Sequence, residues 1–353
     1  MKILIVGAGP TGLTLAIELA RRNLIAKVID RRDSASTLSR AVGITSRSLE
    51  ILSHSGVSER LIKEGIPIQS ACLYQGNHLA LSLPLHSDSS YFPTILGLPQ
   101  DRTEKILADS LSSMGVTVEY QVALNKFQEE GQSVVTLSSN GKEEEFDLII
   151  GADGIHSTVR KNANIPYYGF DLPEQWSIAD VELDGWPYPQ TFTLVQVKPG
   201  IVVVSVPIGK NRYRFVGNCE KVLEAFPMPL KIQTVHREGV FKISVRQAKY
   251  FSKGRVFLAG DAAHCHSPVG GRGMNLGIAD AAQLAKCIIE NNLDQYSPIR
   301  QREDKRVIDI TEHARKLVTA KSVVARIAFS TILAAANHLP LIKRKISQFV
   351  VEF

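Results

Sequence analysis

Residues 1–30 read MKILIVGAGPTGLTLAIELARRNLIAKVID, and this stretch decides the fold. Residues 2–6 form a short apolar run rich in β-branched side chains, which is typical of a buried parallel strand. The run stops at a glycine-rich turn, 7–12, and apolar residues at helical spacing follow it. A second apolar run, 26–29, ends on Asp30. The order of strand, glycine turn, helix, strand and acid predicts a dinucleotide-binding β-α-β unit.

Each glycine of the turn has its own purpose in such a unit. Gly7 permits the tight turn, Gly9 lets the backbone approach a pyrophosphate at the helix N-terminus, and Gly12 lets the helix pack against the strand. Asp30 follows Gly12 by 18 residues, where a carboxylate accepts the hydroxyl groups of a ribose. A glycine-rich turn of purely structural purpose is the alternative, and the motif alone does not separate NAD from FAD.

Length and composition indicate a globular protein of one large or two smaller domains, since 353 residues can bury a sizeable core. The four cysteines are widely spaced, with no CxxC and no His/Cys cluster of metal-ligand spacing, so we expect a reducing compartment, the cytoplasm, and neither disulfides nor a metal site. The N-terminus does not resemble a signal peptide, and no apolar stretch reaches the roughly twenty residues of a membrane helix.

The positive charge lies in the last part of the chain. The net charge is +6, and from Arg300 to the end eleven lysines and arginines face five acidic residues. Few aromatic residues interleave with these charges, so nucleic acid is not an expected partner. Lys343 to Lys345 beside Phe349 suggest a weak peripheral contact with an anionic membrane or partner, and a solvated helical face is the alternative.

A second domain is predicted from residues 166–250, which are rich in strands without helix signals between them. The expected strands are 178–183, 191–197, 201–206, 213–216 and 240–245. We therefore predict a discontinuous nucleotide-binding domain (1–69, 99–165 and 251–297), a mostly antiparallel sheet domain for the substrate (70–98 and 166–250), and a C-terminal segment (298–353) that is helical to about residue 339.

Two further motifs lie far from the glycine turn. The first has the form DGxxSxxR, with Asp153, Gly154, Ser157 and Arg160. The second begins at Gly260-Asp261-Ala262-Ala263-His264 and continues through Pro268 and GGRGMN, residues 270–275, to Asp280. With the first turn, they closely resemble the motifs of the single-component FAD-dependent aromatic hydroxylases, the p-hydroxybenzoate hydroxylase-like flavoprotein monooxygenases, over about residues 1–300.

This resemblance implies an α/β fold. It consists of a Rossmann-like, GR2-type FAD-binding domain with an inserted, mostly antiparallel substrate domain and a helical C-terminal tail. Ile165-Pro166 and residues 178–181 (IADV) are similar to the subgroup that acts on larger phenols, polyketides and rifamycins. Many members of that subgroup carry a thioredoxin-like C-terminal domain, and this sequence ends at Phe353 without one.

The resemblance also assigns roles to individual residues. FAD's phosphates would lie on the turn and its ribose on Asp30 with Arg31, while Arg40 and Gln100 would contact the flavin nucleotide and the ribityl or phosphate region. Asp261 would accept ribityl hydroxyls, and the start of the next helix would face the N1–C2=O edge of the reduced flavin. Arg272 would stabilise the anionic flavin, and Pro268 would lie where oxygen reacts. The expected cofactor-binding residues are Gly7, Gly9, Gly12, Asp30, Arg31, Arg40, Gln100, Asp153, Asp261, Gly273, Met274 and Asn275, and the expected catalytic residues are Arg272 and Pro268.

The implied reaction is reduction of FAD by NAD(P)H, then formation of a C4a-hydroperoxide with O2 and hydroxylation of a phenolic or polycyclic aromatic small molecule. The alternatives are a flavin-dependent reductase or dehydrogenase of the geranylgeranyl reductase type, which does not use O2, and a non-catalytic flavoprotein. A halogenase is disfavoured because no WxWxIP motif surrounds Trp176 or Trp186. The expected assembly is a monomer or homodimer.

Several of these residues also have a purely structural interpretation. Asp153 and Arg160 would then form an ion pair that caps a helix, and His264 would only hydrogen-bond the backbone. Arg272 would be a solvated loop cation. In the sheet domain, the aromatic residues beside Arg214 fit a substrate pocket and a core equally well, so we do not assign them to the site.

Overall fold

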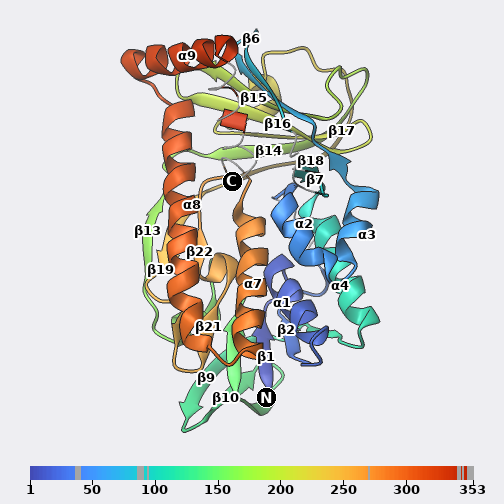
Figure 1. Cartoon of the computed structure of the whole chain (residues 1–353), viewed down its shortest axis with the longest axis vertical. Helices are drawn as coiled ribbons and strands as arrows, with labels where there is room; N and C mark the ends of the chain where they lie inside the picture. The colour runs from blue at the N-terminus through green and yellow to red at the C-terminus, as the bar shows by residue number, and fades with distance from the viewer. Residues whose placement is uncertain are drawn as a thin grey trace.

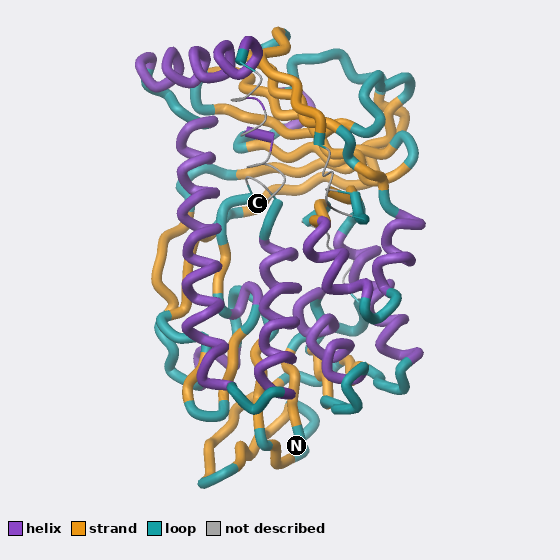
Figure 2. Tube along the Cα trace, in the orientation of Figure 1, coloured by secondary structure: helices purple, strands orange, loops and turns teal. Residues whose placement is uncertain are grey.

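The computed structural model describes residues 1–35, 41–85, 91–93, 95–268, 271–339, 343, 346 and 347. Two large sheets lie one above the other in the long direction of the molecule (Figure 1). Helices surround the sheet that contains the N-terminal strand, whereas the other half is built mainly of strands (Figure 2).

The first sheet has six strands in the order β20-β21-β12-β1-β2-β8, and all but β20 run parallel. Its strands are β1 (Ile3–Val6), β2 (Lys27–Asp30), β8 (Val118–Tyr120), β12 (Leu148–Gly151), β20 (Ser252–Lys253) and β21 (Val256–Leu258). Ile3 pairs with Leu148, and Ile149 pairs with Val256. Strands from the start, the middle and the later part of the chain therefore form one parallel sheet. Both faces of such a sheet are covered, which explains why its strands are continuous apolar runs in the sequence.

Six helices cover or adjoin this sheet. They are α1 (Pro10–Ala20), α2 (Ser46–Ser53), α3 (Val57–Glu64), α4 (Gln100–Ser113), α5 (Thr158–Asn162) and α7 (Gly273–Ile289). Helix α1 starts with Pro10 at its first position and packs against both α4 and α7. Its side chains Leu13, Ile17 and Leu19 are completely buried, so the apolar stripe seen in the sequence faces the core.

The second sheet has seven strands in the order β18-β14-β17-β16-β15-β5-β6. Its strands are β5 (Ser70–Gln75), β6 (His78–Pro84), β14 (Trp176–Leu183), β15 (Thr191–Lys198), β16 (Ile201–Gly209), β17 (Arg212–Gly217) and β18 (Ile232–Phe241). Every neighbouring pair is antiparallel except β15 and β5. The predicted fold class, with a mostly antiparallel sheet inserted between strands of the parallel sheet, is confirmed.

The prediction of one strand over 240–245 is wrong. Val240 belongs to β18, whereas Val245 belongs to β19 (Ser244–Ala248), and β19 pairs with β13 (Tyr167–Asp171) and β22 (His264–Cys265) in a separate three-stranded sheet. The chain changes sheets at Ile243, whose carbonyl accepts a hydrogen bond of 2.8 Å from the N–H of Leu172. Apolar alternation continues across this point, because it reports which face is buried and not which strand is the partner.

Smaller elements complete this part of the chain. One further three-stranded sheet contains β3 (Gly43–Thr45), β4 (Ile66–Pro67) and β7 (Ile95–Gly97). Another contains β9 (Leu124–Glu130), β10 (Ser133–Ser138) and β11 (Glu143–Phe146). A short helix, α6 (Val222–Ala225), packs against β14 and β17. A turn at Asn140-Gly141 joins β10 to β11, with Gly141 at φ +78°.

The tail is helical, as predicted, and docks on the second sheet. Helix α8 (Tyr296–Val318) extends along the molecule, and α9 (Val323–His338) lies across its far end over β6 (Figure 1). Gln196 donates a 2.9 Å hydrogen bond to the carbonyl of Val318, and Asn337 donates one of 2.5 Å to that of Ala80. Among the described residues, no single helix is long and apolar enough to cross a membrane; Leu293–Val318 with Val323–His338, bent by 104°, meets that criterion only as a pair, by length and composition.

Candidate active site

The glycine-rich turn has the geometry that a bound pyrophosphate requires. Gly7 adopts φ +108°, and a Cβ added there would lie 2.3 Å from the carbonyl oxygen of Ala152. A Cβ on Gly12 would lie 1.9 Å from the carbonyl oxygen of Gly7. A Cβ on Gly9 would meet nothing within 4 Å, and no side chain caps the N-terminus of α1. Two glycines are therefore needed for the turn itself, while the third leaves open space at a helix N-terminus, which suits the phosphates of FAD.

Asp30 lies at the end of β2 and is held by the turn and by Arg32. Its Oδ2 accepts a 2.7 Å hydrogen bond from the N–H of Ala8, and Arg32 contacts both carboxylate oxygens at 3.0 and 3.1 Å. Burial by itself would raise the pKa of Asp30, but the hydrogen bonds from Arg32 and Ala8 outweigh it and keep the pKa below its ordinary value. Arg31, the predicted partner, is exposed. Sequence reasoning missed Arg32, because adjacent arginines give no indication of which one turns inward.

Gln100, predicted to contact the cofactor, begins α4 and is bonded to the main chain at Ala41. The N–H of Ala41 donates to Gln100 Oε1 at 3.3 Å, and the N–H of Gln100 donates to the carbonyl of Ala41 at 3.1 Å. Gln100 Nε2 also donates to Glu104 at 2.9 Å, and Glu104 pairs with Arg32 at 3.0 Å. Arg40 lies outside the described residues, but its neighbour Ala41 is thus fixed against α4.

Asp153 caps a helix without an ion pair to Arg160. Its Oδ2 accepts hydrogen bonds from the N–H groups of Thr158 and Val159 at 2.6 and 3.2 Å, at the start of α5. The guanidinium of Arg160 donates instead to the carbonyls of Ala262 and Ile155. Burial raises the pKa of Asp153, although these hydrogen bonds oppose the shift. The DGxxSxxR motif therefore ties α5 to the turn after β21, and the ion-pair interpretation is wrong.

Thr11 brings the glycine turn, the segment after β21 and helix α7 together. A Cβ on Gly260 would lie 2.5 Å from Thr11 Oγ1, and one on Gly277 would lie 2.1 Å from the same atom. Asp261 is exposed beside this contact, and its carbonyl accepts a 3.0 Å hydrogen bond from the hydroxyl of Tyr167. The structure thus places Asp261, the predicted ribityl ligand, at the same edge of the parallel sheet as the glycine turn.

The beginning of α7 is anchored by Asn275. Its amide nitrogen donates to the carbonyls of Gly43 and Gly271 at 2.9 and 3.2 Å, and its oxygen accepts from the N–H of Thr45 at 2.9 Å and from Ser48 at 2.8 Å. The side chain of Asn275 is therefore engaged in the protein, so the predicted contact of residues 273–275 with a flavin edge stays a prediction that concerns their backbone N–H groups.

Arg272 precedes α7 and is buried, so it is not the solvated loop cation of the structural interpretation. Burial lowers the pKa of Arg272 to about 10, which leaves the guanidinium charged at neutral pH. Pro268 lies just before the stretch 269–270, which is outside the described residues, and its carbonyl accepts a 2.9 Å hydrogen bond from the N–H of Gly271. The buried guanidinium of Arg272 therefore lies next to the positive, N-terminal end of α7.

A buried network of charged side chains lies next to this site. His264 Nε2 lies 2.7 Å from Asp280 Oδ2 and 3.3 Å from Asp304 Oδ2, while Arg300 bonds Asp280 at 2.6 Å and Asp304 at 2.5 Å. Asp280 Oδ2 also accepts a 2.8 Å hydrogen bond from the N–H of Gly260. His264 therefore pairs with carboxylates and not with the backbone, which corrects that expectation. Ligand atoms of the three residues lie within 4.8 Å of one another, but the Arg300 guanidinium already supplies the cation.

Sequence reasoning also missed Arg300 and Asp304. They lie on α8, which reads as an ordinary charged helix, but both are buried, with exposed fractions of 2% and 0%. The one available signal is their i, i+4 spacing, which also occurs in solvated helices. Their partners on α7 and β22 are known only from the tertiary structure.

The network makes stability depend on pH. Burial alone would lower the pKa of His264, but Asp304 and Asp280 raise it to about 9. Because the folded-state pKa lies above the unfolded value of about 6.5, the stabilisation is fully present below that pH and is lost as the pH rises through 9, on the order of 3 kcal/mol. Burial and Asp280 raise the pKa of Asp304 to about 8, which acts in the same direction. We expect urea midpoints to fall as the pH rises from 6.5 to 9, and a His264→Gln variant to lose the part of this slope above pH 8, where Asp304 no longer titrates.

Comparisons with known proteins agree with this geometry. A family model described as "FAD binding domain" matches residues 1–225 and 220–318. The chain therefore belongs to the FAD-binding-domain family.

Two relatives are similar over 99% of this chain. The 6-methylpretetramide 4-monooxygenase of Streptomyces rimosus is 31% identical, with 68% of its own length covered, and a rifampicin monooxygenase of Streptomyces venezuelae is 28% identical, with 75% covered. The solved p-nitrophenol 4-monooxygenase PnpA of Pseudomonas putida DLL-E4 shares the fold with a TM-score of 0.88 at 21% identity, over 98% of this chain and 96% of its own. The predicted family and its phenol, polyketide and rifamycin-type subgroup are confirmed: the chain is an FAD-dependent monooxygenase of the aromatic-hydroxylase class, and nothing supports the reductase or the non-catalytic alternative.

Proposed function

We propose that this enzyme uses NAD(P)H, O2 and bound FAD to hydroxylate a phenolic or polycyclic aromatic small molecule. One observation carries the proposal: several groups lie at one edge of the parallel sheet. They are Gly9, which has free space beside it, the exposed Asp261, the buried Arg272 and the start of α7. FAD, when bound and reduced, supplies the chemistry that activates O2 for transfer of one oxygen atom to an electron-rich ring.

The chain's own residues bind and orient the reactants in this proposal. The glycine turn holds the phosphates, Asp261 the ribityl chain, and the N–H groups at the start of α7 the pyrimidine edge of the flavin. In the second sheet Tyr213 and Phe215 are buried in the core, where Phe215 packs edge-on against Phe226 with ring centroids 5.0 Å apart. These aromatic residues belong to the core of the sheet, which is the second of the two interpretations left open by the sequence.

The proposed function is tested with FAD-loaded protein that is reduced anaerobically and mixed with O2 in a stopped-flow spectrometer. We expect a transient absorbance band that belongs to neither reduced nor oxidised flavin. We also expect a hydroxylated product from at least one member of a panel of phenols and polycyclic phenols. Absence of flavin in the purified protein, or no reaction of the reduced flavin with O2, would overturn the proposal.

Replacing Arg272 tests the role of the buried cation. In Arg272→Gln the positive charge beside the reduced flavin is lost, so we expect the midpoint potential of bound FAD to fall, by about 30 mV for each 1.4 kcal/mol of lost interaction in a two-electron couple. The measurement is dye-linked reduction of the bound flavin, and Arg272→Lys is the matched control that keeps a charge. An unchanged potential in Arg272→Gln would place this side chain away from the flavin.

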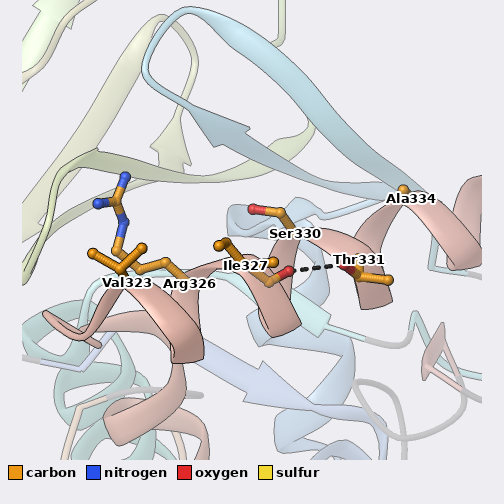
Figure 3. A pocket seen from close by; sticks show the side chains of 6 residues that line it. All are labelled: Val323, Arg326, Ile327, Ser330, Thr331 and Ala334. Carbon is orange, nitrogen blue, oxygen red and sulfur yellow. Dashed lines mark hydrogen bonds between the residues drawn. The ribbon is translucent and has the colours of Figure 1, made fainter.

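We propose, in addition, that α9 makes a weak peripheral contact with an anionic membrane. Val323, Val324 and Ile327 are 64%, 76% and 62% exposed, and a shallow hollow of about 440 Å³ runs past Val323, Arg326 and Ile327 (Figure 3). No acidic residue occurs between Glu312 and Glu352, whereas seven lysines and arginines do. An exposed apolar helix face in a stretch of sequence that has basic but no acidic residues matches the chemistry of an anionic lipid surface.

This contact is tested by co-sedimentation with vesicles. We expect binding to phosphatidylserine-containing vesicles that weakens with salt and is lost in Val324→Asp/Ile327→Asp, and no binding to pure phosphatidylcholine. Dimerisation of the wild type through this face, seen by light scattering and abolished by the same changes without vesicle binding, would contradict the membrane proposal. Both a monomer and a homodimer are compatible with the proposed function, and a cytoplasmic location fits the four cysteines, all of which are free.

A further inference from the structure

A buried ion pair joins two neighbouring strands of the second sheet. Arg214 on β17 faces Asp180 on β14 in register, and its Nε and Nη2 bond the two carboxylate oxygens, each at 2.6 Å. The two residues are 0% and 2% exposed. A buried pair of this kind gains little net stability over apolar residues of similar size, so the fold alone does not account for it.

The third nitrogen of the same guanidinium bonds a residue outside the second sheet. Arg214 Nη1 donates to the carbonyl of Ala41 at 3.3 Å, and that carbonyl also accepts from the N–H of Gln100. Ala41 is the first described residue after the stretch that includes Arg40, a predicted contact of the flavin nucleotide. The planar fork of an arginine can bond a carboxylate with two nitrogens and still direct another at a backbone oxygen, which a lysine cannot do.

From Ala41 the polar contacts continue to the glycine turn. Gln100 bonds Glu104 at 2.9 Å, Glu104 pairs with Arg32 at 3.0 Å, and Arg32 holds Asp30, which accepts from the N–H of Ala8 in the turn. Hydrogen bonds and ion pairs thus link the second sheet to the dinucleotide-binding turn without interruption.

We propose that Asp180 and Arg214 form a positioning pair for the flavin site. Asp180 fixes the guanidinium, and the guanidinium holds the main chain at Ala41 from the side of the second sheet. This contact sets the main chain at Ala41 and the side chain of Gln100 in place for FAD. The inference rests on the proposed function only as far as flavin binding and is independent of the oxygen chemistry.

The test uses the full-length protein freed of FAD, with two informative variants. Arg214→Lys keeps the charge but removes the fork, and we expect the Kd for FAD to rise about tenfold or more, as loss of a charged hydrogen bond implies. Asp180→Leu/Arg214→Met removes both charges, so it avoids an unpaired buried ion and should fold, yet it should lose FAD affinity to a similar degree. The control is Arg212→Gln, because Arg212 is more exposed and only approaches Asp180 at 3.8 Å.

A second readout does not involve the cofactor. In the FAD-free variants we expect faster amide hydrogen exchange at Ala41 and its neighbours, and no change with Arg212→Gln. If the double variant folds and both its FAD affinity and its exchange at Ala41 match the wild type, the pair is merely structural and the inference is overturned. Wild-type protein that binds FAD but fails to react with O2 would overturn the hydroxylase proposal alone, so the two failures are distinguishable.

Discussion

Gly12→Ala is expected to yield a protein that does not retain FAD. The added Cβ would lie 1.9 Å from the carbonyl oxygen of Gly7 and 3.3 Å from Ile5, so the turn or the helix has to move. Displacing backbone removes the pyrophosphate cradle as a whole, and we expect FAD affinity to fall at least a hundredfold, or about 2.7 kcal/mol. Overpacking between α1 and β1 should also lower the free energy of unfolding by about 1–3 kcal/mol. Flavin fluorescence titration and urea denaturation of the FAD-free protein measure the two effects separately.

The matched control is Gly9→Ala, three residues away in the same turn. Gly9 has φ −77° and ψ −177°, which any residue can adopt, and a Cβ there meets no protein atom within 4 Å. The FAD-free variant should therefore be as stable as the wild type, within about 0.5 kcal/mol. Its methyl group would nevertheless occupy the space in which the phosphates are expected, so FAD affinity should fall. Wild-type affinity in Gly9→Ala would show that the phosphates do not approach this residue.

Arg300→Met is expected to be the most destabilising single change in the buried network. Arg300 is the cation that bonds both Asp280 and Asp304, and it also pairs with Glu303. Above pH 8, where Asp304 is ionised as well as Asp280, its removal leaves two buried carboxylates against one imidazole, which typically costs about 3–5 kcal/mol. The measurement is the free energy of unfolding from urea titration of the FAD-free protein.

The control for this change lies two residues further along α8. Arg302 is exposed, and Arg302→Met should alter the free energy of unfolding by no more than about 0.5 kcal/mol. Asp304→Asn in the Arg300→Met background should recover part of the loss, because it removes one of the unpaired charges. Equal stability of Arg300→Met and Arg302→Met would mean that the network contributes nothing to the fold.

The features that sequence could predict are those set by contiguous residues. The strand, glycine turn and helix at the N-terminus follow from the contiguous residues 3–20, whose backbone requirements are local. The helical tail and most strands of the second sheet follow from periodicity in the same way. The position of Asp261 at the end of β21 also follows, because a carboxylate after a buried parallel strand has to lie at the edge of the sheet.

The features that the sequence could not predict depend on which residues, distant in the sequence, become partners in the folded chain. Arg31 and Arg32 are equivalent in the sequence, and Arg32 is the residue that turns inward, where Asp30 and the distant Glu104 on α4 bind it. The strand break at Ile243 is invisible for the same reason, since β18 and β19 differ in their partners and not in their pattern. The pairs that connect α7 to α8, and β17 to Ala41, have no local signature at all.

The pairing of the parallel sheet has a consequence for synthesis of the protein. β1 leaves the ribosome long before one of its two partners, since Ile3 pairs with Leu148, 145 positions later, and β12 in turn waits for β21. Closing such long loops is slow, and apolar strands without partners are prone to aggregate. The edge that receives the flavin is complete only when α7, which begins at Gly273, has also emerged. In the nascent chain β1 can therefore pair early with β2 on one side, but its other edge stays open until β12 has been made, and cofactor loading has to be a late event.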